Sequence, residues 1–332
     1  AYYMERGLKK RWMGVLFAVL ITVTFGLAFN SVQSNTMSAA LQSAFSIEPL
    51  NSGIVISVLT LVIIFGGVHR IAAISSVIVP VMAVGYIALA LFVVLANIDR
   101  IPAVVEQIVG NAFGWHQAVG GGIGTALMQG IKRGLFSNEA GMGSAPNAAA
   151  TAHVTHPAKQ GFIQALGVFT DTLLICSCTA FIILFGEDYV GSGLDGIQLT
   201  QAALTSEVGN IGGIYVAIAT LFFAYSSILG NYYYGEANIR FFTSRQWPVV
   251  LYRMLVGGMV LFGSLASLNL VWNLADVTMA LMSICNLIAI FLLGKYAFRL
   301  LDDYLAQKRK GIKSPVFHKE QMKDIEQDLE CW

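Results

Sequence analysis

The sequence predicts an all-α polytopic membrane protein, and three observations favour that fold class. Hydrophobic residues make up 56% of the 332 residues and charged residues only 12%, whereas soluble domains carry about a quarter charged residues. Apolar runs long enough to cross about 30 Å of hydrocarbon recur along the chain. Lys and Arg residues gather on alternate connections between these runs, which is typical of cytoplasmic loops.

Seven apolar runs are expected to span the membrane as continuous helices, and an eighth, interrupted element is expected at residues 117–152. The seven runs lie at residues 12–37, 52–68, 74–97, 160–186, 212–234, 249–272 and 276–299. The third contains Pro80, whose kink is tolerated where neighbouring helices satisfy the freed carbonyl.

The connections between the runs predict the topology. If the first residues are cytoplasmic, most Lys and Arg fall on the cytoplasmic side, so both ends of this chain are expected in the cytoplasm. The connection 187–211 has no Lys or Arg and is expected outside, with a short helix in it. Residues 1–300 form the expected transmembrane domain, and residues 301–332 form a largely solvated cytoplasmic tail.

The stretch from Gly120 to His156 is expected to contain a helix that is broken inside the membrane. Lys132 and Arg133 interrupt a glycine-rich apolar helix, and the polar residues 137–139 follow. In a broken helix the freed N–H and C=O groups face a cavity and can bind substrate or ions. A long, partly helical cytoplasmic loop is the alternative.

The run GLFSNEAGMGSAPNAAATA (Gly134 to Ala152) closely resembles the signature of the alanine/glycine:cation symporter family of prokaryotes. The resemblance continues through FTDTLLICSCTAFIILF (Phe169 to Phe185), FAYSSILGNYYYGE (Phe223 to Glu236) and LVWNLAD (Leu270 to Asp276). It implies a leucine-transporter-like fold, in which two five-helix inverted repeats each open with a broken helix.

The same resemblance implies that the chain is truncated at its N-terminus. Family members carry a Gly-Thr-Gly-Asn-Ile segment in the first broken helix, and the sequence from Ala1 onward lacks it. We therefore expect residues 1–97 to end the first repeat and residues 98–300 to form the second. About three spans and part of the site would precede Ala1.

Four residues are expected to bind the substrate. Asn30 and Gln33 carry amides that suit an amino-acid carboxylate or ammonium group, although ordinary polarity at a helix end is the alternative. The family resemblance favours Gln33 as a substrate contact. Phe136 and Asn138 lie at the expected break, where an aromatic ring can close over a small side chain.

The hydroxyls of Ser226 and Ser227 are candidate sodium ligands, because the resemblance places a sodium site on this span. Buried serines often bond the preceding helical turn instead. Glu139, Asp171 and Arg133 are candidates for gating or coupling, since unpaired charges are costly at membrane depth. We expect Glu139 to pair with Arg133 or Lys132 as an inner gate, and Asp171 to act functionally or to pack against the broken helix.

Together with these residues, the family resemblance implies a secondary symporter of the bacterial inner membrane, not an enzyme. It would import alanine or glycine with sodium by alternating access, and it needs no cofactor and no metal beyond sodium. Its expected partners are the amino acid, sodium and the lipid bilayer; the net charge of +1 gives no indication of nucleic acid. Proton coupling, or an inactive truncated fragment, is the alternative.

Overall fold

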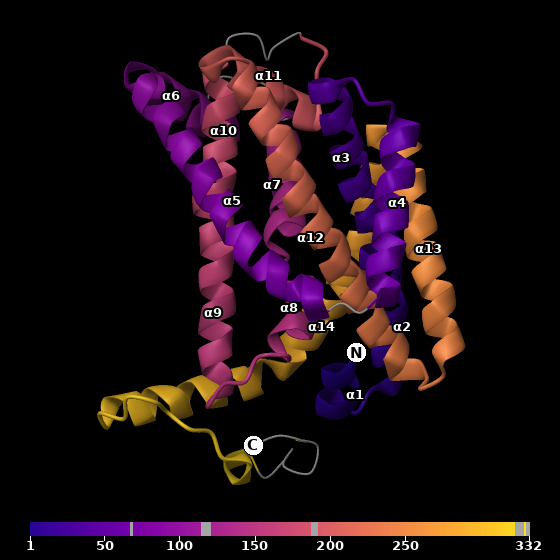
Figure 1. Ribbon diagram of the computed structural model, residues 1–332. Coiled ribbons are helices and arrows are strands. Elements are labelled where there is room, and N and C mark those ends of the chain that lie inside the picture. Colours follow the sequence, from indigo (N-terminus) through magenta and orange to yellow (C-terminus); the bar gives the residue numbers. More distant parts are fainter. Residues whose placement is uncertain (67–68, 114–120, 187–191, 323–328, 330–332) are drawn as a thin grey trace.

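The computed structural model describes residues 1–66, 69–113, 121–186, 192–322 and 329 of the chain, and it is helical with no strand in those ranges (Figure 1). The α-helices are α1 (Tyr2–Leu8), α2 (Arg11–Val23), α3 (Asn30–Phe45), α4 (Pro49–Gly66), α5 (His69–Ala96), α6 (Ile101–Ala112), α7 (Gly121–Asn138), α8 (Ala145–Ala149), α9 (Pro157–Phe169), α10 (Cys176–Phe185), α11 (Gly196–Val208), α12 (Asn210–Phe242), α13 (Gln246–Leu265) and α14 (Leu268–Arg309). The short 3-10 helices are η2 (Ile98–Arg100) and η4 (Lys319–Met322).

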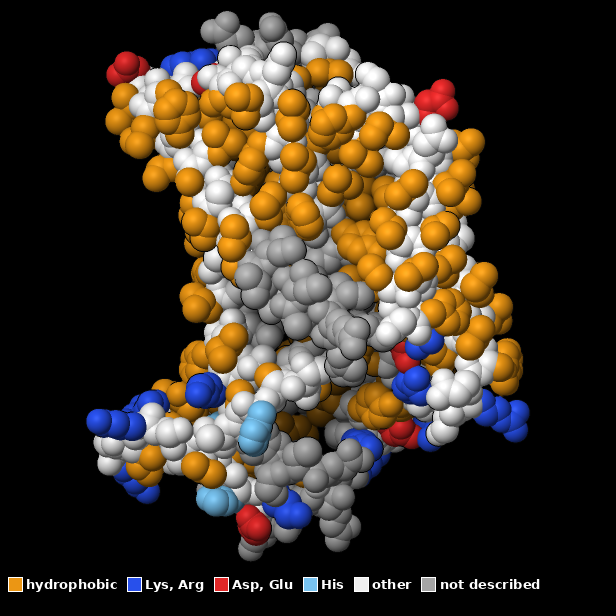
Figure 2. Space-filling model, viewed as in Figure 1, with side chains coloured by type: hydrophobic (Ala, Val, Ile, Leu, Met, Phe, Trp, Pro, Cys, Tyr) orange, Lys and Arg blue, Asp and Glu red, His pale blue; other side chains and the backbone are white. Residues whose placement is uncertain are grey.

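The expectation of a polytopic α-helical membrane protein is confirmed. Within the described residues, seven helical stretches are long and apolar enough to span a bilayer: Arg11–Phe45, Pro49–Gly66, Val79–Ala96, Pro157–Phe185, Asn210–Phe242, Gln246–Leu265 and Leu268–Arg309. Hydrophobic side chains cover the flanks of the bundle, while Lys and Arg gather mainly at the end that holds α1 (Figure 2). We call this end the α1 end and the opposite one the α11 end (Figure 1).

Two of the long spans contain a π-helical turn. Segment η1 (Thr24–Phe29) joins α2 to α3, and η3 (Thr170–Ile175) joins α9 to α10. Such turns re-aim neighbouring side chains and are frequent at functional sites. Here η1 leads into the part of α3 that carries Gln33, and η3 contains Asp171.

Helices α3, α4, α12 and α13 pack against one another as the most densely contacting block of the fold. Asn35 of α3 reaches the far end of α13, where its amide Nδ2 donates to the carbonyls of Gly263 at 3.0 Å and Ala266 at 2.8 Å. The short turn between α13 and α14 is thereby fixed against α3.

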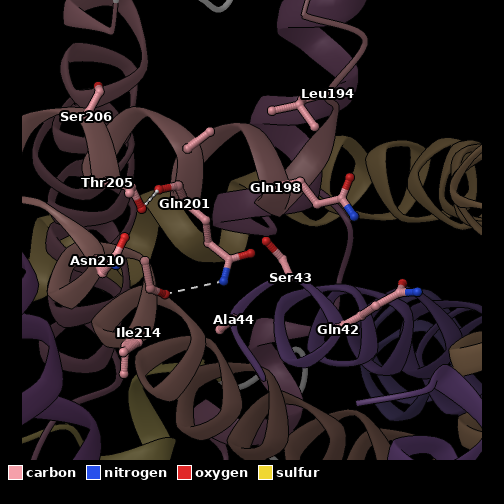
Figure 3. A pocket seen from close by; sticks show the side chains of 12 residues that line it. Gln42, Ser43, Ala44, Leu194, Gln198, Gln201, Thr205, Ser206, Asn210 and Ile214 are labelled. Carbon is pink, nitrogen blue, oxygen red and sulfur yellow. Dashed lines mark hydrogen bonds between the residues drawn. The ribbon is translucent and has the colours of Figure 1, made fainter. Parts of the chain in front are cut away.

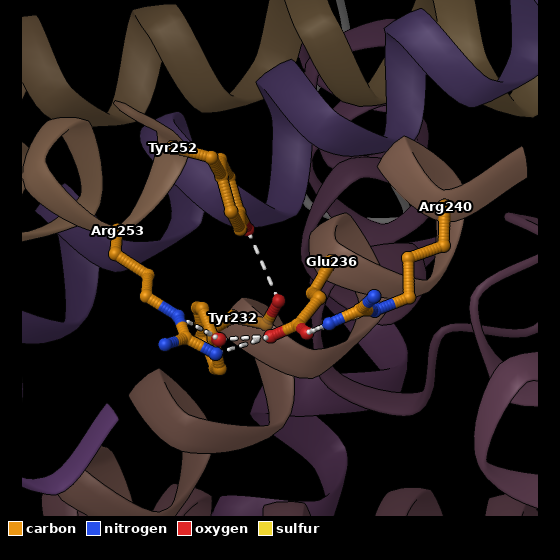
Figure 4. Close-up of polar contacts among 5 residues, drawn as sticks. All are labelled: Tyr232, Glu236, Arg240, Tyr252 and Arg253. Atoms are coloured by element: carbon orange, nitrogen blue, oxygen red, sulfur yellow. Dashed lines mark hydrogen bonds and ion pairs between the residues drawn. The ribbon is translucent and has the colours of Figure 1, made fainter. Parts of the chain in front are cut away.

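A partly exposed ionic cluster ties α12 to α13 near the α1 end (Figure 4). Arg253 donates through Nε to the Tyr232 hydroxyl at 2.8 Å and lies 3.5 Å from the Glu236 carboxylate, which also binds Arg240 at 2.6 Å. The Tyr252 hydroxyl donates to the Tyr232 carbonyl at 3.1 Å. These contacts hold the C-terminal half of α12 against α13.

The boundary between the last two spans differs from the expected one. The expectation ended one run at residue 272 and began the last run at residue 276. In the structure the turn lies at Ala266–Ser267. Trp272 and Asp276 therefore both belong to α14. The polar residues are accommodated because they meet partners on α7, as described below.

The tail is also more ordered than the expected solvated segment. Helix α14 continues to Arg309, past residue 300. The Gln307 side chain then accepts from the Val316 backbone N–H at 3.0 Å and donates to the Val316 carbonyl at 2.8 Å. Phe317 is 4% exposed and donates through its backbone N–H to Thr155. The chain therefore folds back onto the loop that precedes α9.

The expected short helix of the connection 187–211 is present as α11 (Gly196–Val208). Residues 187–191, which include two of the acidic residues of that connection, lie outside the described residues.

Candidate functional site

The interrupted helix lies where the sequence predicted it. Helix α7 ends at Asn138, α8 begins at Ala145, and the residues between them leave the helical path. Glu139 has φ 57° and Gly143 has φ 85°, so the chain passes through left-handed backbone conformations that prevent α7 from continuing. The result is a pair of helix ends with free backbone groups.

Side chains from other helices hold this break in place. Ser137 donates through its hydroxyl to the Asp171 carboxylate at 2.6 Å, and Asn138 donates through Nδ2 to the Thr172 hydroxyl at 2.9 Å. Asn286 of α14 donates through Nδ2 to the Gly141 carbonyl at 2.7 Å. The π-helical turn η3 and helix α14 therefore position the two sides of the break.

A cavity of about 420 Å³ lies between α3, the break and α12. We call it the central cavity. It brings together five of the predicted site residues from three separate parts of the chain. They are Gln33, Phe136, Glu139, Ser226 and Ser227. It is also lined by Phe29, Ser137, Gly230, Asn231 and Tyr234.

The α12 wall of the central cavity presents oxygen acceptors. The hydroxyls of Ser226 and Ser227 both donate to the Phe223 carbonyl, at 2.8 and 3.0 Å. Their hydrogens are thus used within the helix, as the alternative interpretation expected. The remaining lone pairs of both oxygens are still available to a cation in the cavity.

Asn231 is a lining residue that sequence reasoning missed. It is 5% exposed, and its Nδ2 has no hydrogen-bond partner among the described residues. It lies four residues after Ser227, so both share one face of α12. That spacing was the available signal, but a single Asn beside three tyrosines is equally typical of an interfacial helix end.

The opposite wall is aromatic. The ring of Phe136 lies 4.6 Å from that of Phe29 and 4.5 Å from that of Trp272, measured between ring centroids. Trp272 in turn carries the Arg133 guanidinium over its face at 4.1 Å. The stack Phe29–Phe136–Trp272–Arg133 therefore closes the central cavity on the side of α14.

The charges near the break pair differently from the expected inner gate. Glu139 accepts from the Ser144 hydroxyl at 2.5 Å, while Arg133 binds the Asp276 carboxylate and Lys132 lies 3.3 Å from it. The expected pairing of Glu139 with Arg133 or Lys132 was therefore wrong. Asp276 lies two turns into α14, whose first residue is Leu268; a Cβ added to Gly196 of α11 would lie 3.6 Å from the Leu268 side chain. The cluster lies on the α11 side of the break (Figure 1).

Four of the predicted residues do not line the central cavity, and one of them is Arg133, which binds Asp276 as described above. Asn30 is fully buried and donates through Nδ2 to the Gly26 carbonyl at 3.0 Å. Asn138 and Asp171 are used to hold the break. For Asp171 this geometry agrees with the second of the two expected roles, packing against the broken helix.

Comparison with known proteins gives consistent matches along the whole chain. The model of the sodium:alanine symporter family matches residues 1–319. The chain is 56% identical over 332 residues to the probable sodium/glutamine symporter GlnT of Bacillus subtilis, covering 100% of this chain and 69% of that protein. It is 53% identical to the amino-acid carrier protein AlsT of the same organism, covering 100% and 70%.

A more distant relative is the sodium/alanine symporter AgcS of Methanococcus maripaludis, which is 38% identical over 301 residues, or 88% of this chain and 66% of that protein. The family match and these identities agree with the seven described helical stretches that are long and apolar enough to span a membrane. The chain belongs to the sodium:alanine symporter family.

Proposed function

We propose that the protein is a secondary symporter that imports a small neutral amino acid together with sodium by alternating access. The observation that carries this proposal is the central cavity, where the two serine hydroxyls of α12 face Gln33 and Phe136 beside the break. Cation and substrate ligands therefore share one space, which is what coupled binding requires. The chain lies in the bacterial inner membrane with both ends in the cytoplasm.

Sodium is the proposed coupling ion because the central cavity offers oxygen ligands, namely the uncharged hydroxyls of Ser226 and Ser227 and the carboxyl group of Glu139. Ser226 and Ser227 offer lone pairs, and hard cations prefer oxygen ligands. The relatives named as sodium/glutamine and sodium/alanine symporters support the same ion. Further ligands would come from the break or from the substrate carboxylate.

Alanine is the first candidate substrate. The Phe136 ring lines the central cavity and limits the size of the substrate side chain that fits beside it. Glutamine is the second candidate, and a specific observation favours it. Gln33 of α3 and Asn231 of α12 both place amides on the lining of the central cavity, and a primary amide is complementary to both. The relative at 56% identity is named as a probable glutamine symporter.

The cluster of Lys132, Arg133 and Asp276 is the proposed outer gate. It joins α7 to α14 on the α11 side of the central cavity, and its aromatic neighbour Trp272 covers Phe136. Opening toward the outside would separate the basic residues from Asp276. Closing would restore the pair and seal the stack over the bound amino acid.

Asp276→Asn should lower the uptake rate at least about tenfold and change sodium-dependent amino-acid binding less than about threefold. The reason is that Asn leaves two basic side chains without their carboxylate, whereas Asp276 does not line the central cavity. Initial uptake rates and binding are measured on the same preparation. Asp302→Asn, an exposed position farther along α14, is the matched control. Equal uptake by both variants would contradict the gate.

The proposed function is tested by accumulation of a labelled neutral amino acid in liposomes that contain the purified protein. A sodium gradient should drive accumulation. Uptake that does not depend on sodium and is abolished by a protonophore would show that protons are the coupling ion.

A further inference from the structure

A second cavity, of about 760 Å³, lies at the α11 end between the end of α3, helix α11 and the start of α12 (Figure 3). We call it the outer cavity. Its polar lining consists mainly of amides and hydroxyls and includes Gln42, Ser43, Gln198, Gln201, Thr205 and Asn210. Among the described residues that line it there is no Lys, Arg, Asp or Glu. A ligand without net charge suits such a lining, because nothing there would neutralise an isolated ion.

Gln201 is the best-defined group of the outer cavity. It is 2% exposed, and its Nε2 donates to the Ala40 carbonyl at 3.1 Å and to the Gly213 carbonyl at 3.3 Å. Because both partners are acceptors, the amide cannot be turned over without losing both bonds. Its Oε1 is buried with no partner among the described residues, and Figure 3 shows this oxygen on the side of Ser43.

The neighbouring hydroxyl adds a second acceptor. Thr205 donates through Oγ1 to the Gln201 carbonyl at 2.7 Å, so this oxygen can only accept from a ligand. An N–H donor, such as an ammonium group, is the complement of these oxygens. The amides of Gln42, Gln198 and Asn210 also line the cavity and can donate to a carboxylate. Together these groups suit a zwitterion.

The outer and central cavities share two helices. Gln33 and Ser43 lie ten residues apart on α3, which corresponds to about 15 Å along a helix. The start of α12 lines the outer cavity, and Ser226 and Ser227 of the same helix line the central one. A solute that follows the α3–α12 pair from the α11 end therefore meets the outer cavity first.

We propose that the outer cavity is a separate binding site for a zwitterionic neutral amino acid, occupied without sodium before the solute enters the central cavity. This inference rests on the proposed function for the identity of the solute. The outer cavity differs from the central cavity in its lining residues, none of which is assigned to sodium.

Ala202→Leu tests the outer site, because Ala202 is exposed, lines the outer cavity and lies on a helix that accepts leucine. Equilibrium binding of labelled L-alanine and L-glutamine to the full chain is measured in choline buffer and in sodium buffer. The parent should bind one of them without sodium, and Ala202→Leu should weaken that binding at least about fivefold. Ala112→Leu, on α6 and outside the cavity lining, should bind as the parent does.

The two proposals fail in different ways. Sodium-dependent binding retained in Ala202→Leu shows that the variant is folded and that the central site is intact. Absence of sodium-independent binding in the parent, or equal sodium-independent binding by the parent and Ala202→Leu, would overturn the outer site. If the parent instead shows sodium-independent binding but no additional binding in sodium, the proposed symport is overturned and the outer site stands.

Discussion

The double variant Ser226→Ala, Ser227→Ala should need at least about tenfold more sodium than the parent for half-maximal amino-acid uptake. Both hydroxyl oxygens line the central cavity, and both have their hydrogens bonded to the Phe223 carbonyl. Alanine removes the two lone-pair donors and leaves the helix intact. A tenfold change corresponds to about 1.4 kcal/mol, within the range of a contact between a polar group and a charge.

The measurement is the initial uptake rate as a function of sodium concentration at a fixed, saturating amino-acid concentration. Ser264→Ala is the matched control, since the Ser264 hydroxyl also donates to a carbonyl of its own helix, at 3.1 Å, but does not line the central cavity. The control should keep the parent's sodium requirement. An unchanged requirement in the double variant would remove these serines from the cation site.

Gly143→Ala should lower the free energy of unfolding by about 2 to 4 kcal/mol, the sum of a left-handed backbone cost and overpacking. Gly143 has φ 85°, and a Cβ there would lie 2.7 Å from both Asn286 Cγ and Phe17 Cζ. Displacing Asn286 would also break its bond to the Gly141 carbonyl. The substitution therefore acts on the break itself.

Thermal unfolding of the purified protein in detergent measures this effect. Gly130→Ala is the control, because Gly130 lies within the helical part of α7 and a Cβ there meets no atom within 4 Å. It should be neutral or stabilise the helix by up to about 1 kcal/mol. Equal unfolding temperatures for the two variants would contradict the left-handed turn at the break.

Much of the fold could be predicted because the bilayer imposes simple rules on the sequence. An apolar run of about 20 residues must be a spanning helix. A polar Ser-Asn-Glu sequence among glycines is tolerated there only where the helix is broken and faces a cavity. Those two rules located the spans and the break at Glu139. The inverted-repeat relation between the two halves stays a prediction from the resemblance.

The candidate site could be predicted only in part, because pairing depends on how the helices are rotated about their axes. Gln33 and Phe136 meet in the central cavity as expected, whereas Asn30 faces its own helix. Arg133 pairs with Asp276 instead of the expected Glu139. Asn231 gave no signal beyond its spacing from Ser227. Which side chains pair depends on how the helices pack in three dimensions, and the sequence pattern does not specify that packing.

Sodium-driven accumulation in liposomes tests the proposed symport most directly. The purified protein is reconstituted, an inward sodium gradient is imposed, and labelled L-alanine and L-glutamine are followed over time. We expect one of them to accumulate above its external concentration, to leak out when a sodium ionophore is added, and to remain when a protonophore is added. Accumulation that needs no sodium, or no accumulation of either amino acid, would contradict sodium-coupled symport by this chain.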